Sequence, residues 1–156
     1  MAKGLQVGDV APDFELPGTA GPFRLSERRG ERVFLLFYPG DDTPGCTKQF
    51  CSYRDRSDDV GALGATLVGI SRQDLDSHAG FTSKHGLTVP LLADVDGAVA
   101  TAYGVAAPVV GTRRAVFIVD EDGIVRFRKV HVIGLRFEDS DDLKAALDAL
   151  PPRAVV

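Results

Sequence analysis

Residues 33–51 read VFLLFYPGDDTPGCTKQFC, and this stretch decides the fold. The run at residues 33–38 is apolar on both faces of an extended chain, which is typical of a central buried strand. Pro39 and Gly40 end that strand, because both disfavour the interior of a sheet. A helix is then expected over about residues 44–60. The stretch therefore predicts a buried strand that leads into a helix, as in α/β folds.

Strand-like and helical runs alternate on both sides of this stretch. Residues 8–14 look like a loop leading into an edge strand, and residues 23–25 look like a second short strand. The later expected strands are residues 66–71, 90–94, 115–120 and 124–130, and the later expected helices are residues 75–84, 98–103 and 141–150. Gly86 and Pro151-Pro152 are helix stops, and the turn at residues 121–123 makes a hairpin. Crossover helices imply parallel strands elsewhere, so we expect a mixed sheet with helices on both faces.

The composition is that of an ordinary globular chain. Its 156 residues are 44% apolar and 26% charged, which fits one domain spanning residues 1–156. The net charge of −4 comes without a sustained basic run, so no nucleic-acid partner is expected. The longest apolar run is too short to cross a bilayer and the N-terminus lacks a signal-peptide pattern, so we expect no membrane partner and a cytoplasmic location. Cysteines in that reducing compartment are more often reactive than structural.

Cys46 falls at a helix start that favours an anion. Thr43 is a good N-cap and Pro44 suits the first helical position, which places Cys46 in the first turn. Unpaired backbone amides and the positive end of the helix dipole lie there. Such a setting favours the thiolate, which is the nucleophilic form of cysteine. The local sequence alone therefore predicts a reactive Cys46.

Cys51 stands at a spacing that a continuous helix cannot bridge. Five helical residues place the two Cα atoms about 8–9 Å apart, with side chains roughly 140° apart, whereas a disulfide needs less than about 7 Å. A Cys46–Cys51 bridge would require the turn to unwind, which suits a redox cycle better than a static bridge. The alternatives are a structural disulfide, a metal site and two inert core cysteines. The helical spacing disfavours a structural disulfide, and the lack of further ligands disfavours a metal site. The Thr-Pro-Gly sequence before Cys46 disfavours two inert core cysteines.

Two nested motifs carry a resemblance to a known family. Pro39, Thr43 and Cys46 meet the pattern Pro-x-x-x-Thr-x-x-Cys, and residues 42–48 read Asp-Thr-Pro-Gly-Cys-Thr-Lys, with Cys51 five residues after Cys46. The chain thereby closely resembles the peroxiredoxins, and within them the peroxiredoxin Q or bacterioferritin comigratory protein group. Further matching segments lie at residues 8–14, 77–81, 90–94, 103–105 and 114–120. The resemblance implies a thioredoxin fold with added N-terminal strands, which agrees with the α/β element order.

The resemblance implies a thiol peroxidase acting on hydrogen peroxide and organic hydroperoxides. Cys46 matches the peroxidatic cysteine, whose thiolate attacks the peroxide and becomes a sulfenic acid. Thr43 matches the hydroxyl that hydrogen-bonds thiolate and peroxide, and Pro39 matches the residue that shields the thiolate from water. The amides of Gly45 and Cys46 would help to bind substrate at the helix start.

Arg114 and Cys51 complete the implied site. Arg114, three residues before Phe117, matches the distant arginine that would favour the thiolate and stabilise charge on the peroxide oxygens. Arg113 is the alternative, and the spacing favours Arg114. Cys51 matches the resolving cysteine, whose disulfide with Cys46 would be reduced by thioredoxin or glutaredoxin. A monomer is the family-based expectation, with a dimer as the alternative.

The chain departs from the group's pattern in two places. Gln49 stands where the group usually has Glu, and residues 104–113 lack the tryptophan and lysine often seen there. No flavin, haem or nucleotide motif appears, so no cofactor or metal is expected, and His78, His85 and His131 carry no functional signal. Two rival functions stay open. One is a thiol-disulfide oxidoreductase, despite the lack of Cys-x-x-Cys, and the other is a redox-sensing or holdase module.

Overall fold

The computed structural model describes residues 5–41, 43–107, 111–131 and 137–150. A mixed five-stranded sheet lies at its centre, in the order β5-β4-β3-β8-β9. Strand β3 (Val33–Phe37) runs parallel to β4 (Thr66–Ser71) and antiparallel to β8 (Ala115–Val119). Strand β5 (Leu91–Ala93) extends the parallel side, and β9 (Val125–Val130) forms a hairpin with β8. The mixed sheet and the late hairpin predicted from the sequence are both confirmed.

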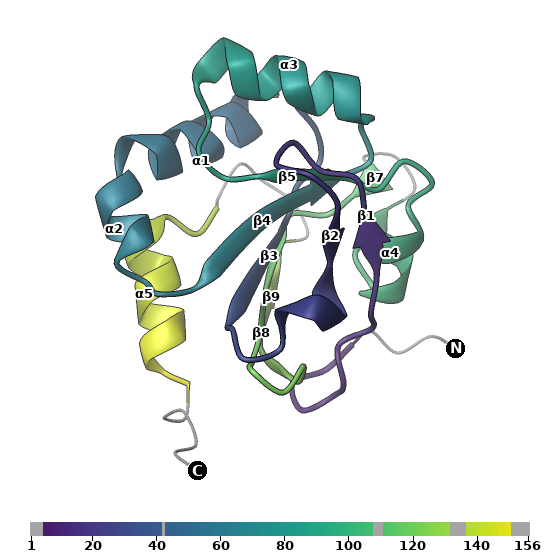
Figure 1. Cartoon of the computed structure of the whole chain (residues 1–156), viewed down its shortest axis with the longest axis vertical. Coiled ribbons are helices and arrows are strands. Elements are labelled where there is room, and N and C mark those ends of the chain that lie inside the picture. Colours follow the sequence, from purple (N-terminus) through teal and green to yellow (C-terminus); the bar gives the residue numbers. More distant parts are fainter. Residues whose placement is uncertain (1–4, 42, 108–110, 132–136, 151–156) are drawn as a thin grey trace.

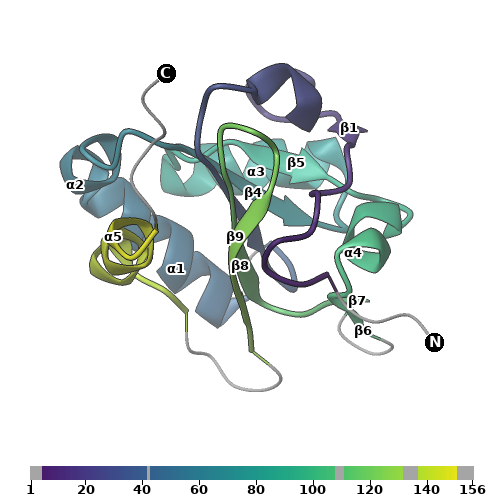
Figure 2. The same ribbon diagram turned by 90° about the horizontal axis from the view of Figure 1, so that it is seen from below.

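Alternation along β3 builds one core on each face of the sheet. Phe34 and Leu36 point to one face, and Leu35 and Phe37 point to the other. The first face is covered by α1 (Pro44–Asp55), α3 (Leu75–His85) and α5 (Ser140–Asp148), and the second by α4 (Ala98–Ala102), β1 (Glu15–Leu16) and β2 (Phe23–Arg24) (Figure 1). Figure 2 shows α1 and α5 on one side of the strands and α4 on the other. Burying each such side chain stabilises the fold by roughly 1.5–3 kcal/mol, so the apolar run of β3 favours covering the sheet on both faces.

The helix expected over residues 44–60 is helical except at Arg56, where it divides into two helices. Helix α1 ends at Asp55, and a separate short helix, α2 (Ser57–Gly61), follows. Arg56 between them has φ −111° and ψ 37°, outside the helical region. Two acidic residues in the first turn of α2 favour a new helix start there. The prediction missed the break because no Gly or Pro marks it.

Other features also differ from the expectation. Leu25 lies in a short 3-10 helix (Leu25–Arg28) and not in a strand. A small antiparallel pair, β6 (Ala106–Ala107) with β7 (Gly111–Thr112), was not predicted. Strands of two residues leave no periodicity to detect. The expected stop at Pro151-Pro152 lies outside the described residues.

The stop predicted at Gly86 is confirmed, and Asp74, which was not predicted as a cap, begins α3. Asp74 accepts a hydrogen bond from the Ser77 amide at 2.9 Å, and Gly86 ends the helix with φ 60°. Only glycine adopts this left-handed conformation without strain, so Gly86 fixes where α3 ends. Both ends of α3 are thus defined, and the buried His78 is held between them.

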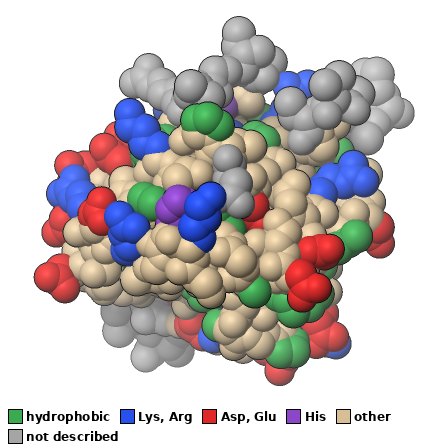
Figure 3. All heavy atoms as spheres, turned by 90° about the horizontal axis from the view of Figure 1, so that it is seen from above, with side chains coloured by type: hydrophobic (Ala, Val, Ile, Leu, Met, Phe, Trp, Pro, Cys, Tyr) green, Lys and Arg blue, Asp and Glu red, His purple; other side chains and the backbone are tan. Residues whose placement is uncertain are grey.

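The face that Figure 3 shows carries both acidic and basic side chains among its described residues. In the described residues, no helix is long and apolar enough to span a membrane. Nor do these residues contain a group of three or more His, Cys, Asp or Glu side chains that could hold a metal ion.

Candidate active site

The link between β3 and α1 places Cys46 at a helix start. Thr43 has an extended backbone (φ −78°, ψ 148°) and Pro44 opens α1, so Cys46 lies in the first turn as predicted. The first backbone bond of the helix runs from the Thr47 amide to the Thr43 carbonyl at 2.8 Å. The amides of Gly45 and Cys46 come before it and have no acceptor within the helix. The buried sulfur therefore lies at the positive end of α1.

Arg114 lies against this sulfur. Its Nη2 donates to Sγ of Cys46 at 3.2 Å, and the arginine is only 5% exposed. The two residues are 68 positions apart in sequence. They meet because Ala115 pairs with Phe37 across β8 and β3, which sets the start of β8 beside the end of β3. The spacing argument chose Arg114 over Arg113, and it is the Arg114 guanidinium that contacts Cys46.

Thr43 does not use its side chain in the way we predicted. As the N-cap residue of α1 it was expected to accept a bond from the helix, but its hydroxyl makes no cap bond. The hydroxyl instead donates to the Gly40 carbonyl at 3.0 Å, which closes the turn before the helix. Within the described residues it makes no bond to Cys46. Its exposed position still leaves the oxygen's lone pairs open to a donor from solution.

Cys51 lies on the same helix as Cys46. Helix α1 is continuous through both residues, both thiols are free, and Cys51 is half-buried against the core beneath α1. The helical separation of about 8–9 Å therefore applies to this state. The structure represents a reduced form in which the two sulfurs are not positioned to bond.

Gln49 and Tyr53 extend the polar contacts behind Arg114. The Oε1 atom of Gln49 accepts from Nη1 of Arg114, and its Nε2 donates to the Tyr53 hydroxyl at 3.0 Å. The Tyr53 hydroxyl in turn donates to the backbone carbonyl of Glu138 at 2.5 Å. All these residues are at most 5% exposed. The sequence had one signal for part of this, since residues 49 and 53 are four apart and share a helix face.

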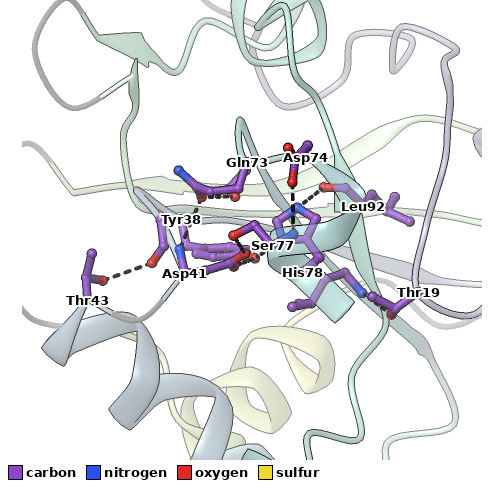
Figure 4. A network of polar contacts seen from close by, with 12 residues as sticks. Thr19, Tyr38, Asp41, Thr43, Gln73, Asp74, Ser77, His78 and Leu92 are labelled. Atoms are coloured by element: carbon purple, nitrogen blue, oxygen red, sulfur yellow. Dashed lines mark hydrogen bonds and ion pairs between the residues drawn. The ribbon is translucent and has the colours of Figure 1, made fainter. Parts of the chain in front are cut away.

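A second polar cluster holds the loop that precedes α1. Asp41 accepts from the Tyr38 hydroxyl at 2.6 Å and from the Ser77 hydroxyl at 2.7 Å, and it lies 2.7 Å from Nδ1 of His78 (Figure 4). The Asp41 amide also donates to Gln73 at 3.1 Å. These contacts tie the loop to α3 and to the segment before it. Sequence analysis gave His78 no role, and it lies at the centre of this cluster.

The cluster also shifts the ionisation of its members. Burial opposes ionisation of Asp41, but hydrogen bonds with His78, Tyr38 and Ser77 outweigh it and lower the pKa of Asp41. Burial and the neighbouring Asp41 charge raise the pKa of Tyr38 well above its ordinary value. Asp41 is therefore an anion and Tyr38 a neutral donor at neutral pH.

Pro39 lies between the buried Tyr38 and Gly40, directly after β3, and is itself half-buried. Of the predicted site residues, the structure thus brings Arg114 into contact with Cys46. It places Gly45, Thr43 and Pro39 in the adjoining turn, and Cys51 further along α1.

Comparisons with known proteins agree with this geometry. The model of the AhpC/TSA family matches residues 7–128. Peroxiredoxin Bcp of Bacillus subtilis is 36% identical over 138 residues, which cover 82% of this chain and 88% of the relative. The crystal structure of peroxidoxin BcpB from Mycobacterium tuberculosis has a TM-score of 0.82 at 34% identity, covering 96% of this chain and 99% of the other. A structure of the bacterioferritin comigratory protein of Xanthomonas campestris has a TM-score of 0.80 at 28% identity, covering 93% and 96%. The chain therefore belongs to the AhpC/TSA family, and within it to the peroxiredoxins of the Bcp and peroxiredoxin Q group, which makes it a thiol peroxidase.

Proposed function

We propose that Cys46 is the peroxidatic nucleophile and that the substrates are hydrogen peroxide and small organic hydroperoxides. The Cys46 thiolate attacks the terminal oxygen of the peroxide, and the O–O bond breaks as the S–O bond forms. The leaving oxygen takes a proton and departs as water or alcohol, and Cys46 becomes a sulfenic acid. The Xanthomonas campestris relative is described as having alkyl peroxide reduction activity, which supports including organic hydroperoxides.

The observation that carries this proposal is the contact between Arg114 Nη2 and Cys46 Sγ at 3.2 Å. A buried cation and the positive end of α1 thus both face the sulfur that acts as the nucleophile. The same guanidinium is placed to stabilise the negative charge that passes to the peroxide oxygens. Cys51 is assigned no such role because it lies mid-helix, away from that cation.

The remaining turn residues bind and shelter the peroxide in this proposal. Thr43 offers its hydroxyl to the peroxide, and the amides of Gly45 and Cys46, which have no acceptor within α1, bind the oxygen that carries charge. Pro39 limits access of water to Sγ from the side of the β3 end. The family resemblance suggests these roles, and the place of these residues in the turn that leads into α1 supports them.

Cys51 is proposed as the resolving cysteine. Its thiol attacks the sulfur of the Cys46 sulfenic acid, water leaves, and a Cys46–Cys51 disulfide forms. Since α1 holds the two residues too far apart, this step requires α1 to unwind around them. Thioredoxin, or alternatively glutaredoxin, then reduces the disulfide. The cycle suits a monomer in the cytoplasm, where thiols are kept reduced.

The test is peroxide consumption with a thioredoxin system, comparing Cys46→Ser with Cys51→Ser. Cys46→Ser should abolish turnover. In Cys51→Ser, one equivalent of peroxide should still oxidise Cys46 to the sulfenic acid. Reduction of that sulfenic acid should then depend on an added small thiol. Full turnover by Cys46→Ser would refute the assignment, and full thioredoxin-driven turnover by Cys51→Ser would refute the resolving role.

A further inference from the structure

Arg114 is held from behind by a buried chain of hydrogen bonds that the reaction scheme above does not use. The chain runs from Arg114 through Gln49 and Tyr53 to the carbonyl of Glu138. Gln49 is 1% exposed and Tyr53 is fully buried, so water does not compete for these bonds. Their donors and acceptors must therefore match within the protein.

Only one arrangement of hydrogens satisfies this chain. The Glu138 carbonyl can only accept a hydrogen bond, so the Tyr53 hydroxyl must donate its single hydrogen to that carbonyl. The Tyr53 oxygen then accepts, which requires the Gln49 amide to turn its NH2 group toward Tyr53. The amide oxygen consequently faces Arg114, whose guanidinium can only donate. A flipped amide would set donor against donor at Arg114.

The anchor of this chain is connected back to the backbone of Arg114. The Glu138 carboxylate lies 2.9 Å and 3.0 Å from Nε2 of His131, with Lys129 at 3.6 Å. The His131 amide donates to the Arg114 carbonyl at 2.8 Å. The chain of contacts thus leaves the Arg114 side chain and returns to the Arg114 backbone, which makes it a closed frame.

The frame orients Arg114 without neutralising it. Among the described residues, no carboxylate forms an ion pair with Arg114, and its neighbours are the neutral Gln49 amide and Cys46 Sγ. Burial raises the pKa of Tyr53 far above neutrality, so its hydroxyl remains a donor at working pH. A carboxylate at position 49 would offer Tyr53 a second acceptor for one hydrogen and would draw charge from Arg114.

We propose that Tyr53 is a positioning residue for the oxidation of Cys46. Together with the Glu138 carbonyl, Tyr53 fixes the orientation of the Gln49 amide, and the amide oxygen in turn holds the Arg114 guanidinium against the sulfur without neutralising its charge. This inference rests on the function proposed for Cys46 and Arg114. It explains in physical terms why an amide, and not a carboxylate, suits position 49 in this chain.

The test is Tyr53→Phe, with Tyr103→Phe as the matched control. Tyr103 is also fully buried and donates to a backbone carbonyl, that of Pro12 at 2.7 Å, but it lies in the core on the other face of the sheet. Tyr53→Phe should slow single-turnover oxidation of Cys46 by about 5- to 20-fold and move its rate–pH profile to higher pH, because Arg114 loses its fixed orientation. Tyr103→Phe should oxidise within about twofold of the wild type, with the same profile.

A second variant tests the amide itself. Gln49→Glu should slow oxidation and shift the profile in the same direction, and adding Tyr53→Phe to it should cost less than about twofold more, since the two residues act as one unit. Wild-type kinetics in Tyr53→Phe, or an equal loss in Tyr103→Phe, would overturn the inference, as would faster oxidation in Gln49→Glu. Peroxide reduction that persists in Cys46→Ser would instead overturn the proposed function, and this inference with it.

Discussion

Replacing Arg114 with alanine removes the guanidinium that lies 3.2 Å from Sγ of Cys46. Two unit charges at that distance attract by about 5 kcal/mol at an effective dielectric constant of about 20. The cost of burying the cation offsets part of this, and a hydrogen bond to a charged partner is worth about 1.5–3 kcal/mol net. We therefore expect Arg114→Ala to slow the first oxidation of Cys46 by roughly 10- to 150-fold.

The assay is stopped-flow oxidation by hydrogen peroxide in a Cys51→Ser background, which isolates the first chemical step. Arg113→Ala is the matched control, because it removes the neighbouring guanidinium from a half-buried side chain without touching Sγ. It should stay within about threefold of the parent. Arg114→Lys should recover part of the rate, since it restores charge but not the planar pair of donors that reaches Sγ and Gln49 together. Equal losses in Arg113→Ala and Arg114→Ala would refute the reasoning.

Three further predictions concern the loop, the disulfide and the packing of α1. The pKa of Asp41 is lower in the folded protein than in the unfolded chain, where it is near 4, so the ionised carboxylate stabilises the fold above about pH 4 and this contribution is lost as the pH falls through the folded pKa. The difference in unfolding free energy between wild type and Asp41→Asn should therefore shrink below about pH 4. A difference in urea titrations that does not change with pH would contradict this. Oxidation with one equivalent of peroxide should link the tryptic peptides 33–48 and 49–54 and lower the helical circular dichroism signal, whereas an unchanged spectrum in the cross-linked protein would rule out unwinding of α1. An alanine at Gly69 would set its Cβ 2.8 Å from the Phe50 ring, so Gly69→Ala should destabilise the fold by about 1–3 kcal/mol in chemical denaturation. The control is Gly80→Ala, whose Cβ meets nothing within 4 Å and which should not destabilise the fold. Similar effects of both changes would refute the packing argument.

Much of the site could be predicted because its signals are local. Thr43, Pro44 and Cys46 lie within four residues at the helix start, so helix-start rules locate the sulfur from the sequence alone. The apolar run of β3 likewise identified the strand on which both cores are built. The position of Arg114 beside Cys46 came from the family resemblance, since nothing local in the sequence shows that the start of β8 lies beside the end of β3.

Most of the parts that escaped prediction depend on partners distant in sequence, and one depends on a choice between two local partners. Tyr53 and Glu138 are 85 positions apart, and a backbone carbonyl that accepts a side-chain bond leaves no trace in residue identities. His78 lies in the matching segment 77–81 but carries no functional signal in the sequence, and folding sets it 2.7 Å from Asp41. The Thr43 hydroxyl could have capped α1 or closed the preceding turn, and side-chain propensity does not distinguish the two.

Trapping the sulfenic acid tests the central claim most directly. Cys51→Ser protein would be treated with one equivalent of hydrogen peroxide in the presence of dimedone, digested with trypsin and analysed by mass spectrometry. Cleavage after Lys48 places Cys46 on peptide 33–48, apart from position 51. The account predicts the dimedone adduct on Cys46, with its formation strongly slowed by Arg114→Ala. An unmodified Cys46 after the peroxide has been consumed would contradict it.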